Sequence, residues 1–355
     1  MPARAWRGTV NISVERLGEF TRQALRVAGL NDDDARTTAD LLVLTDTWGV
    51  FTHGTKNLRG YIRRLQGGGI RAGARPRVVS EGPAWAMVDA DSAIGMVGSS
   101  FAMRMAMDKA RATGVGYVGV RNSCHFGAAG CYAAMAATEG LIGVAMANDT
   151  PSVVVPGARR AVLGSNPFSF AVPTGETHPI LLDIATSAVA GGKVFTAAAL
   201  GKEIPDHWIV DGEGLPTTDP RIFPRSAALL PMAGHKGSGL AVFIETLSGI
   251  VTGASIAAQV LSWSFDDPTA PTGHGAAFLA IDVRQMMGAG ELHSRTAELL
   301  RQIREAPRAK GVDRLYVPGE MEWERRERAL RDGIELPEDV MAPLQLLADE
   351  LGISW

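Results

Sequence analysis

The chain has 355 residues, of which 46% are hydrophobic and 21% charged, and its formal net charge is −3. This composition predicts a soluble globular protein that folds without disulfide bonds or a structural metal. The small negative charge gives no broad electrostatic basis for binding nucleic acid or an anionic membrane.

The cysteines and the N-terminal sequence bear on where the protein works. Cys124 and Cys131 lie in one small-residue stretch, without CxxC spacing or a second pair. This arrangement argues for a reducing compartment and against a zinc site. Residues 1–20 contain no apolar signal core, and no stretch is long and uncharged enough to span a bilayer. We therefore expect a cytoplasmic protein.

The N-terminal part is expected to be helical up to about residue 70. Apolar residues recur at helical spacing over 14–29. The side chains of 31–34 then offer caps for the start of a second helix. A third helix over 55–66 is expected to end at the glycines that follow it.

The middle of the chain alternates between strands and helices. Two short strands are expected around a turn at 81–83, and a helix over 99–114 follows. Further strands are predicted at VGYVGVRN (115–122), LIGVAMAN (141–148), SFAVPT (169–174), PILLDIATS (179–187) and AAFLAIDV (276–283), with mostly irregular structure over 201–234 and a long apolar helix over 239–254.

Charged helical sequence returns from Glu291 to the end of the chain. The ends are therefore helical and the middle is mixed. This order predicts an α/β protein in which a helical domain, built from residues 1–72 and 287–355, packs on a central mixed α/β domain over 73–286.

Two glycine-rich motifs could bind phosphate. Residues 114–119 read GVGYVG, but this motif follows a helix and opens a strand, the reverse of a dinucleotide fingerprint. A helix cap at Gly114 is the better interpretation, and a Rossmann fold is not indicated. The second motif, AGHKGSGL, frames Lys236 just before a long helix, where backbone N–H groups could meet a phosphate. A solvated lysine in a flexible turn explains it equally well.

Four polar residues lie in settings that suit chemistry, namely His53, His125, Asp183 and His235. Each has a structural explanation as well; Asp183, for example, could cap a helix starting near Ser187. Together, glycine-flanked histidines and a strand-end carboxylate suit proton transfer to a small substrate. They also suit a hydrolytic metal site. The absence of a close HxH or HxxxH pair favours proton transfer.

Seven motifs occur in the order of one known family. They are THG, NSCHFGAAG, LGSNPFSFAVP, LLDIATS, GHKGSGL, LSGIVTGA and YVPGE. In this order the chain resembles the malate/L-lactate dehydrogenase family, which lacks a Rossmann fold. That family includes sulfolactate, ureidoglycolate and diketogulonate oxidoreductases and Δ1-piperideine-2-carboxylate reductases. The resemblance covers about residues 10–325.

The resemblance implies an L-sulfolactate dehydrogenase-like α/β fold whose central domain binds NAD(H) or NADP(H). It implies hydride transfer between the nicotinamide and a 2-keto/2-hydroxy acid or a cyclic imino acid. It also implies a homodimer with each active site near the subunit interface.

The resemblance also implies roles for individual residues. His53 and His125 match the motif histidines that act as proton donor or acid/base group, and His125 has the more open frame. Asp183 matches the strand end beside the cofactor and joins them as a catalytic candidate. Cofactor contacts are implied for Asn148, Asp149, Thr150, Asp183, Ile184, Ala185, His235, Lys236, Gly319 and Glu320.

The sequence departs from the family pattern where the substrate is expected to bind. Many members read SHG with an arginine three residues later, which suits a substrate carboxylate. Here Thr52 and Asn57 stand at those positions, and Cys124 stands where asparagine is common. We therefore expect Thr52 and Asn57 to contact the substrate. A simple 2-hydroxy dicarboxylate is not implied, and a cyclic imine or larger keto acid fits.

Two other classes of protein stay open on the sequence. One is a metal-dependent hydrolase that uses His53, His125 and Asp183. The other is a catalytically silent nucleotide-binding protein. The sequence does not choose between NAD and NADP, since the acidic-residue rule of Rossmann proteins does not apply to this fold.

Overall fold

A computed structural model describes residues 9–355. Its centre is a seven-stranded mixed sheet in the order β2-β3-β4-β11-β5-β6-β7, in which only the β3–β4 pair is parallel. The strands are β2 (Arg77–Gly82), β3 (Trp85–Asp89), β4 (Val115–Ser123), β5 (Ile142–Ala147), β6 (Phe168–Val172), β7 (Ile180–Ile184) and β11 (His274–Ile281). A largely antiparallel sheet confirms that the fold is not a Rossmann fold.

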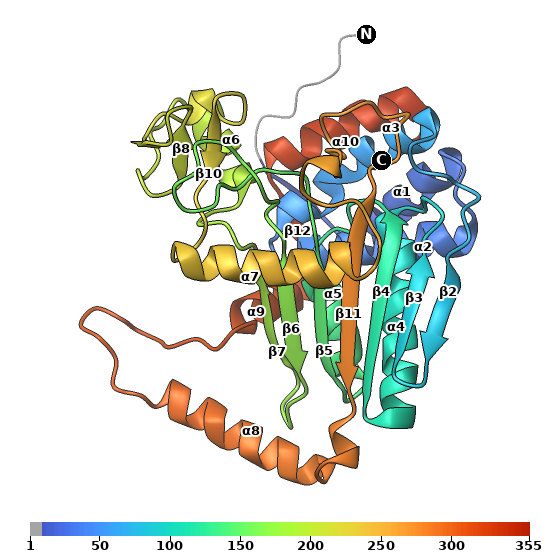
Figure 1. The fold of residues 1–355 in the computed structure, drawn as a ribbon, viewed down its shortest axis with the longest axis vertical. Coiled ribbons are helices and arrows are strands. Elements are labelled where there is room, and N and C mark those ends of the chain that lie inside the picture. Colours follow the sequence, from blue (N-terminus) through green and yellow to red (C-terminus); the bar gives the residue numbers. More distant parts are fainter. Residues whose placement is uncertain (1–8) are drawn as a thin grey trace.

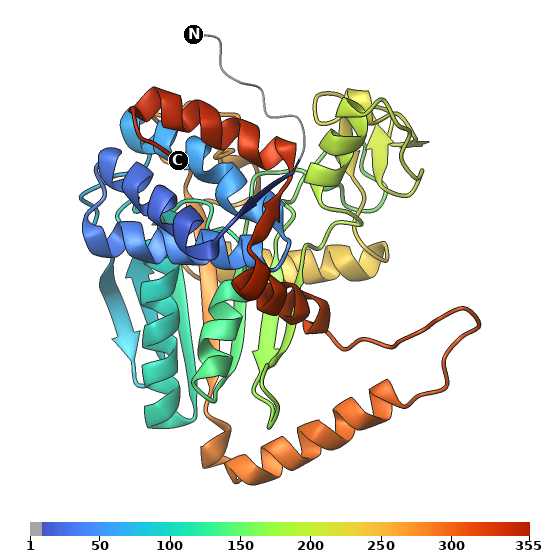
Figure 2. The same cartoon turned by 180° about the vertical axis from the view of Figure 1, so that it is seen from behind.

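Helices cover both faces of this sheet. Two of them, α4 (Gly95–Thr113) and α5 (Gly130–Thr138), pack on one face, as seen from behind in Figure 2. On the opposite face, α7 (His235–Glu245) crosses the strands in Figure 1 and continues as a π-helical turn over Thr246–Ile250. The predicted helix over 239–254 therefore begins earlier and changes its winding near its end.

The GVGYVG motif serves packing. Gly114 ends α4 with a φ of 89°, which confirms the expected helix cap. A Cβ atom at Gly116 would lie 2.1 Å from the carbonyl oxygen of Ala106 in α4. The motif glycine thus lets helix and strand approach closely, and the motif needs no phosphate to explain it.

The two ends of the chain share one hydrophobic core. Strands β1 (Val10–Ile12) and β12 (Ile334–Leu336) form an antiparallel pair. The helices of this layer are α1 (Val14–Val27), α2 (Asp32–Thr47), α3 (Leu58–Gly67), α9 (Glu320–Asp332) and α10 (Glu338–Leu351). Apolar residues of α1, α2, α3 and α10 form one buried cluster. Figures 1 and 2 place most of this layer over one edge of the sheet.

Helix α8 (Ala289–Arg304) lies apart from those terminal helices. It runs along the opposite end of the sheet and returns to α9 through residues 305–319 as an extended arm (Figures 1 and 2). Its buried residues are only Thr296 and Leu300. The division into domains at 72/73 and 286/287 stays a prediction.

The segment 201–234 is mostly irregular, as predicted, but it also contains a second, three-stranded sheet that the sequence did not reveal. Its strands are β8 (Ile209–Asp211), β9 (Pro216–Thr217) and β10 (Ala227–Leu229), and α6 (Gly191–Ala199) packs beside them. Strands of two or three residues are too short to show a hydrophobic alternation, so the pattern could not reveal them. We call this unit the small lobe.

A buried carboxylate anchors the turns that carry His53. Asp46, only 1% exposed, accepts hydrogen bonds from the backbone N–H (3.0 Å) and hydroxyl (2.6 Å) of Thr55. Its second oxygen, Oδ1, has no hydrogen-bond partner, and a Cβ atom at Gly54 would lie 1.8 Å from it. Burial raises the pKa of Asp46 to about 7, and the bonds from Thr55 only partly oppose this.

Asp46→Asn should change how stability depends on pH. Between about pH 4 and pH 7 the unfolded chain releases a proton that folded Asp46 keeps, so the wild type loses stability as pH rises through this window. Asparagine does not titrate. Urea unfolding at pH 4 and pH 8 should therefore show a loss that is larger in the wild type by about 1–3 kcal/mol. Equal losses in both proteins would contradict the raised pKa.

Candidate active site

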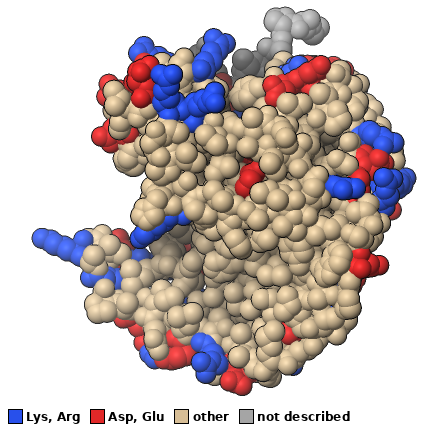
Figure 3. Space-filling view, viewed as in Figure 1, with Lys and Arg blue, Asp and Glu red and all other residues tan. Residues whose placement is uncertain are grey.

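A large cleft opens at one end of the central sheet, where the ends of several strands lie together. β4, β5 and β7 finish at this end of the sheet, and β11, which runs in the opposite direction, begins there. The cleft has a volume of about 1590 Å³ and is lined by the ends of these strands, the turns that hold His53, α6 of the small lobe and the start of α9. Figure 3 also shows a hollow between the small lobe and the α8 arm, but no residue of α8 lines the cleft.

His125 follows β4 and is held by a buried tyrosine. The Tyr61 hydroxyl lies 2.6 Å from His125 Nδ1, and Tyr61 is fully buried. Burial raises the pKa of Tyr61 well above its usual value, so the hydroxyl stays protonated. It therefore donates a hydrogen bond to Nδ1. The backbone N–H of Gly127 donates to the same nitrogen at 3.4 Å. The proton of neutral His125 therefore sits on Nε2, which hydrogen-bonds to no group within residues 9–355.

Aromatic rings surround His125. The indole of Trp263 lies nearly parallel to the imidazole, with ring centres 4.6 Å apart. The His53 ring is 5.7 Å away. Burial, followed by the proximity of His53, lowers the pKa of His125 to about 3. His125 is therefore neutral at pH 7 as long as no anion lies beside it.

His53 lies on the short turn before α3. Thr52 Oγ1 is 2.9 Å from His53 Nδ1, so the predicted substrate residue Thr52 orients the imidazole. Burial lowers the pKa of His53, and the charge of Asp149 partly opposes this. The structure thus brings Thr52, His53 and His125 to one cleft wall.

The negative charge nearest to both histidines belongs to Asp149, which pairs with a buried histidine. Asp149 Oδ1 lies 3.2 Å from Nε2 of His274, which is 3% exposed. The other ring nitrogen, Nδ1, faces the Thr272 hydroxyl at 2.8 Å. Burial alone would raise the pKa of Asp149, but the hydrogen bond and charge of His274 outweigh it and lower the pKa.

The remaining cofactor candidates near the strand ends differ in their surroundings. Asn148 is buried, with its amide bound to Ser255 O (2.7 Å) and Gly275 N (2.8 Å), so it supports the cleft wall. Thr150, Ile184 and Ala185 line the cleft.

Asp183 faces the same cleft from β7. Its Oδ2 accepts a hydrogen bond from the backbone N–H of Gly130 at 2.7 Å, at the first turn of α5. Burial raises the pKa of Asp183 to about 6, and the charge of Glu322 adds to this effect. The bond from Gly130 acts in the opposite direction. The Asp183 side chain is exposed to the cleft, so its carboxyl can meet a ligand there.

Two other predicted contacts lie away from the histidines. His235 and Lys236 are exposed in the first turn of α7 and do not line the cleft. Gly319 does line it, with a φ of 93° and no room for a Cβ atom, which would lie 2.8 Å from Leu181. Glu320 points instead into a second cavity of about 220 Å³.

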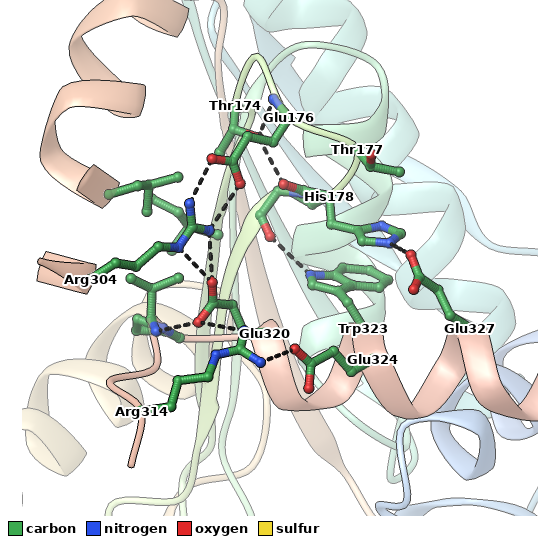
Figure 4. Close-up of a pocket in the computed structure, with 15 residues that line it drawn as sticks. Thr174, Glu176, Thr177, His178, Arg304, Arg314, Glu320, Trp323, Glu324 and Glu327 are labelled. Atoms are coloured by element: carbon green, nitrogen blue, oxygen red, sulfur yellow. Dashed lines mark hydrogen bonds and ion pairs between the residues drawn. The ribbon is translucent and has the colours of Figure 1, made fainter. Parts of the chain in front are cut away.

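This second cavity lies where the α8 arm meets the body of the protein (Figure 4). Glu320 binds Arg304 of α8 at 2.7 Å and lies 3.6 Å from Arg314. Arg304 also pairs with Glu176, in the hairpin between β6 and β7, at 2.7 Å. The carboxylate of Glu320 therefore fastens the arm, and its contact with the cofactor stays a prediction.

The hydrolase alternative has no support. Within residues 9–355 no group of three or more His, Cys, Asp or Glu side chains is placed to hold a metal. In the same part of the chain no helix is long and apolar enough to cross a membrane.

Sequence reasoning missed three residues of this site: Tyr61, Trp263 and His274. Tyr61 follows His53 by about two helical turns, but an aromatic residue there is ordinarily read as core. Trp263 lies in an irregular segment without periodicity. Only His274, between two glycines before a strand, offered a signal like that of His125.

Comparisons with known proteins agree with this architecture. A model of the malate/L-lactate dehydrogenase family matches residues 12–345. The malate dehydrogenase of Pyrococcus horikoshii is 34% identical over 355 residues, covering 97% of this chain and 96% of that protein. The Δ1-pyrroline-2-carboxylate/Δ1-piperideine-2-carboxylate reductase of Pseudomonas putida is 32% identical over 350 residues, covering 98% and 99%.

A solved structure extends the likeness to the fold. The sulfolactate dehydrogenase of Methanocaldococcus jannaschii superposes with a TM-score of 0.89 at 33% identity, covering 97% of this chain and 98% of that one. The predicted L-sulfolactate dehydrogenase-like fold is thereby confirmed. The chain belongs to the malate/L-lactate dehydrogenase family.

Proposed function

We propose that this oxidoreductase transfers a hydride between NAD(H) or NADP(H) and a 2-keto/2-hydroxy acid or cyclic imino acid, and that His125 exchanges the proton. The observation that carries the proposal is the Tyr61–His125 hydrogen bond, which leaves only Nε2 of His125 for the substrate. The catalytic roles of His125, His53 and Asp183 are part of this proposal.

The cleft fits such a cofactor together with a small substrate. Its volume of about 1590 Å³ exceeds the roughly 300–1,000 Å³ of ordinary small-molecule pockets. Asp183 offers a carboxyl to hydroxyl donors, and Gly319 adds backbone without a side chain beside Leu181 of the same strand. When bound, the nicotinamide supplies or accepts the hydride.

The residues of this chain manage the proton. In reduction, the carbonyl oxygen or imine nitrogen gains the electron pair of the reacting double bond and takes a proton from Nε2 of His125 in its imidazolium form, whose Nδ1–H then donates to the Tyr61 hydroxyl oxygen, and His125 is left neutral. A substrate carboxylate or the developing anion raises the pKa of His125 by charge attraction, which allows the ring to carry and release a proton. Tyr61 holds the ring, and the carboxylate of Asp149, bound to His274, lies nearby.

The first experiment follows NADH and NADPH oxidation with panels of keto acids and cyclic imines. We expect turnover with members of at least one panel. His125→Asn should lower kcat by about 10²-fold or more, because the proton donor is lost. Fluorescence titration should find cofactor binding nearly unchanged.

Wild-type protein that binds the cofactor but turns over no member of either panel would indicate a silent nucleotide-binding protein. Retained turnover in His125→Asn, with loss in His53→Asn, would exchange the two roles.

Lys236 and His235 are proposed to contact a polar part of the cofactor, with Asn148, Asp149, Thr150, Ile184, Ala185 and Glu320 as further cofactor contacts. Support comes from the position of Lys236, which is exposed in the first turn of α7. There the helix end favours an anion. No side-chain partner of Lys236 occurs within residues 9–355.

Lys236→Ala should therefore weaken cofactor binding. Loss of a charge-assisted hydrogen bond predicts a dissociation constant raised by about 10–150-fold. Fluorescence titration with NADH and NADPH measures it, and Lys310→Ala, an exposed lysine in the arm, is the control. Equal affinities in both variants would remove Lys236 from the site.

The substrate pocket is proposed to favour a neutral side chain. Asn57 lines the cleft and donates its amide to the Thr52 carbonyl at 2.9 Å. Lys193 of α6 also lines the cleft and has no ion-pair partner within residues 9–355, but the two cations nearest to Asn57 in sequence are paired, Lys56 with Asp339 (2.7 Å) and Arg59 with Glu350 (2.9 Å). Neither is free to grip a second substrate carboxylate. Keto acids with neutral side chains and cyclic imines fit this wall better than dicarboxylates.

Asn57→Arg should shift this preference toward dicarboxylates. An arginine could hold a carboxylate with two charge-assisted bonds. We expect the ratio of kcat/KM for oxaloacetate over neutral keto acids to rise by about tenfold. Asn57→Gln, which adds length without charge, is the matched control. Efficient oxaloacetate or malate turnover by the wild type would mean that another group supplies the charge.

We also propose a cytoplasmic homodimer. The face of α7 and the turn after it exposes Val242, Phe243, Ile250 and Val251, and Figure 3 shows few charged side chains across the middle of this side. Such a patch favours burial by a second copy. A monomer in sedimentation equilibrium at micromolar concentration would contradict the dimer.

A further inference from the structure

A buried arginine on α3 gathers one segment of the chain. The guanidinium of Arg64 donates to the carbonyl oxygens of Ser262 (2.8 Å), Trp263 (2.5 Å), Asp266 (3.2 Å) and Ala270 (2.8 Å). All four belong to residues 262–270, which we call the tryptophan loop. This loop has no helix or regular strand of its own.

The surroundings of Arg64 are unusual for a charged side chain. It is 1% exposed, and no carboxylate within residues 9–355 lies close enough to form an ion pair with it. A buried guanidinium is costly unless its donors are satisfied. Here backbone carbonyls of the loop accept hydrogen bonds from these donors. Burial of the Arg64 charge is therefore tolerated only while the loop keeps the conformation that presents these carbonyls.

The neighbours of Arg64 on α3 are shaped for the same contact. Gly60, Arg64 and Gly67 lie on one face of the helix, at spacings of four and three residues. A Cβ atom at Gly60 would lie 2.9 Å from the Trp263 ring, and one at Gly67 would lie 2.8 Å from the Pro268 carbonyl oxygen. This face of α3 therefore accepts the loop in close contact.

The loop delivers its tryptophan to the proton-transfer site. The Trp263 ring lies nearly parallel to His125, at 4.6 Å and 20°, and to Tyr61, at 5.0 Å and 21°. The indole thus covers both partners of the hydrogen bond that orients His125. Phe265 of the same loop also lines the cleft and is 71% exposed.

We propose that Arg64 is a positioning residue for the reaction. By holding the carbonyls of the tryptophan loop, it keeps Trp263 against His125 and Tyr61 and so fixes both the proton-transfer ring and one wall of the substrate pocket. The inference rests on the proposed function for its kinetic part. Its structural part, that Arg64 orders the loop, stands independently.

The experiment compares Arg64→Met with Arg63→Met. Arg63 is the next residue of the same helix and is exposed, so its variant controls for loss of charge and for the changed helix. Amide hydrogen exchange should accelerate by at least about tenfold across residues 262–270 in Arg64→Met only. Exchange in the strands of the central sheet should not change.

The kinetic arm uses the best substrate of the wild type. Arg64→Met should lower kcat by about 10–100-fold, since small displacements of reacting groups are costly. Cofactor affinity should stay within about twofold. Arg64→Lys keeps a cation and three donors and should recover part of both loop protection and turnover, which also provides a variant that folds if Arg64→Met does not.

A double-mutant cycle with Trp263→Leu identifies the route of the effect. If Arg64 acts through Trp263, the double variant should be little slower than the slower single variant. If the losses of turnover in the two single variants multiply in the double variant, the two residues act independently and the proposal is overturned. Unchanged amide hydrogen exchange across residues 262–270 in Arg64→Met would also overturn it. If the wild type turns over no substrate, the proposed function fails and the kinetic role of Arg64 fails with it, while the exchange result still decides whether Arg64 orders the loop.

Discussion

The hydrogen bond between Tyr61 and His125 ties together parts of the fold that are distant in sequence. Tyr61 belongs to α3, whose position depends on the hydrophobic core shared by both ends of the chain, whereas His125 follows β4 of the central sheet. Trp263 covers both rings from a third segment. A defined proton position on His125 therefore requires that the terminal helices, the sheet and the tryptophan loop have all packed. The site is therefore complete only in the full tertiary structure.

The titratable groups around His125 mostly favour their neutral forms. Burial lowers the pKa of His53 and His125 and raises that of Cys124 and Tyr61, so each of these groups favours its uncharged form. Asp149 is the exception, because His274 stabilises its charge. An incoming carboxylate or a developing oxyanion thus adds a charge beside the histidines, where the partly buried surroundings screen it less than bulk water does.

The sequence predicted the elements whose signals are local. The strands that carry His125 and Asp183 have long apolar runs, Asn31 caps α2 as expected, and Gly114 ends α4. The ordered motifs identified the family and its fold. The small lobe was missed because its strands are too short for periodicity. Tyr61 and Trp263 were missed because their importance comes from a contact between segments about 200 residues apart, which no local pattern encodes. Lys236 illustrates the opposite case. Its glycine-rich motif is conspicuous in the sequence, but its side chain lies outside the cleft of the single chain.

The α8 arm has a consequence for the conditions under which the protein keeps its shape. Its helix buries only two residues, while Arg304 joins it to Glu176 and Glu320 at the end nearest the body. Electrostatic attraction of this partly solvated kind weakens as dissolved ions screen it, whereas apolar burial in the sheet is insensitive to screening or is strengthened by salting-out ions. Ionic strength therefore acts selectively on this molecule: concentrated salt loosens the arm while the sheet and the cleft it supports keep their form.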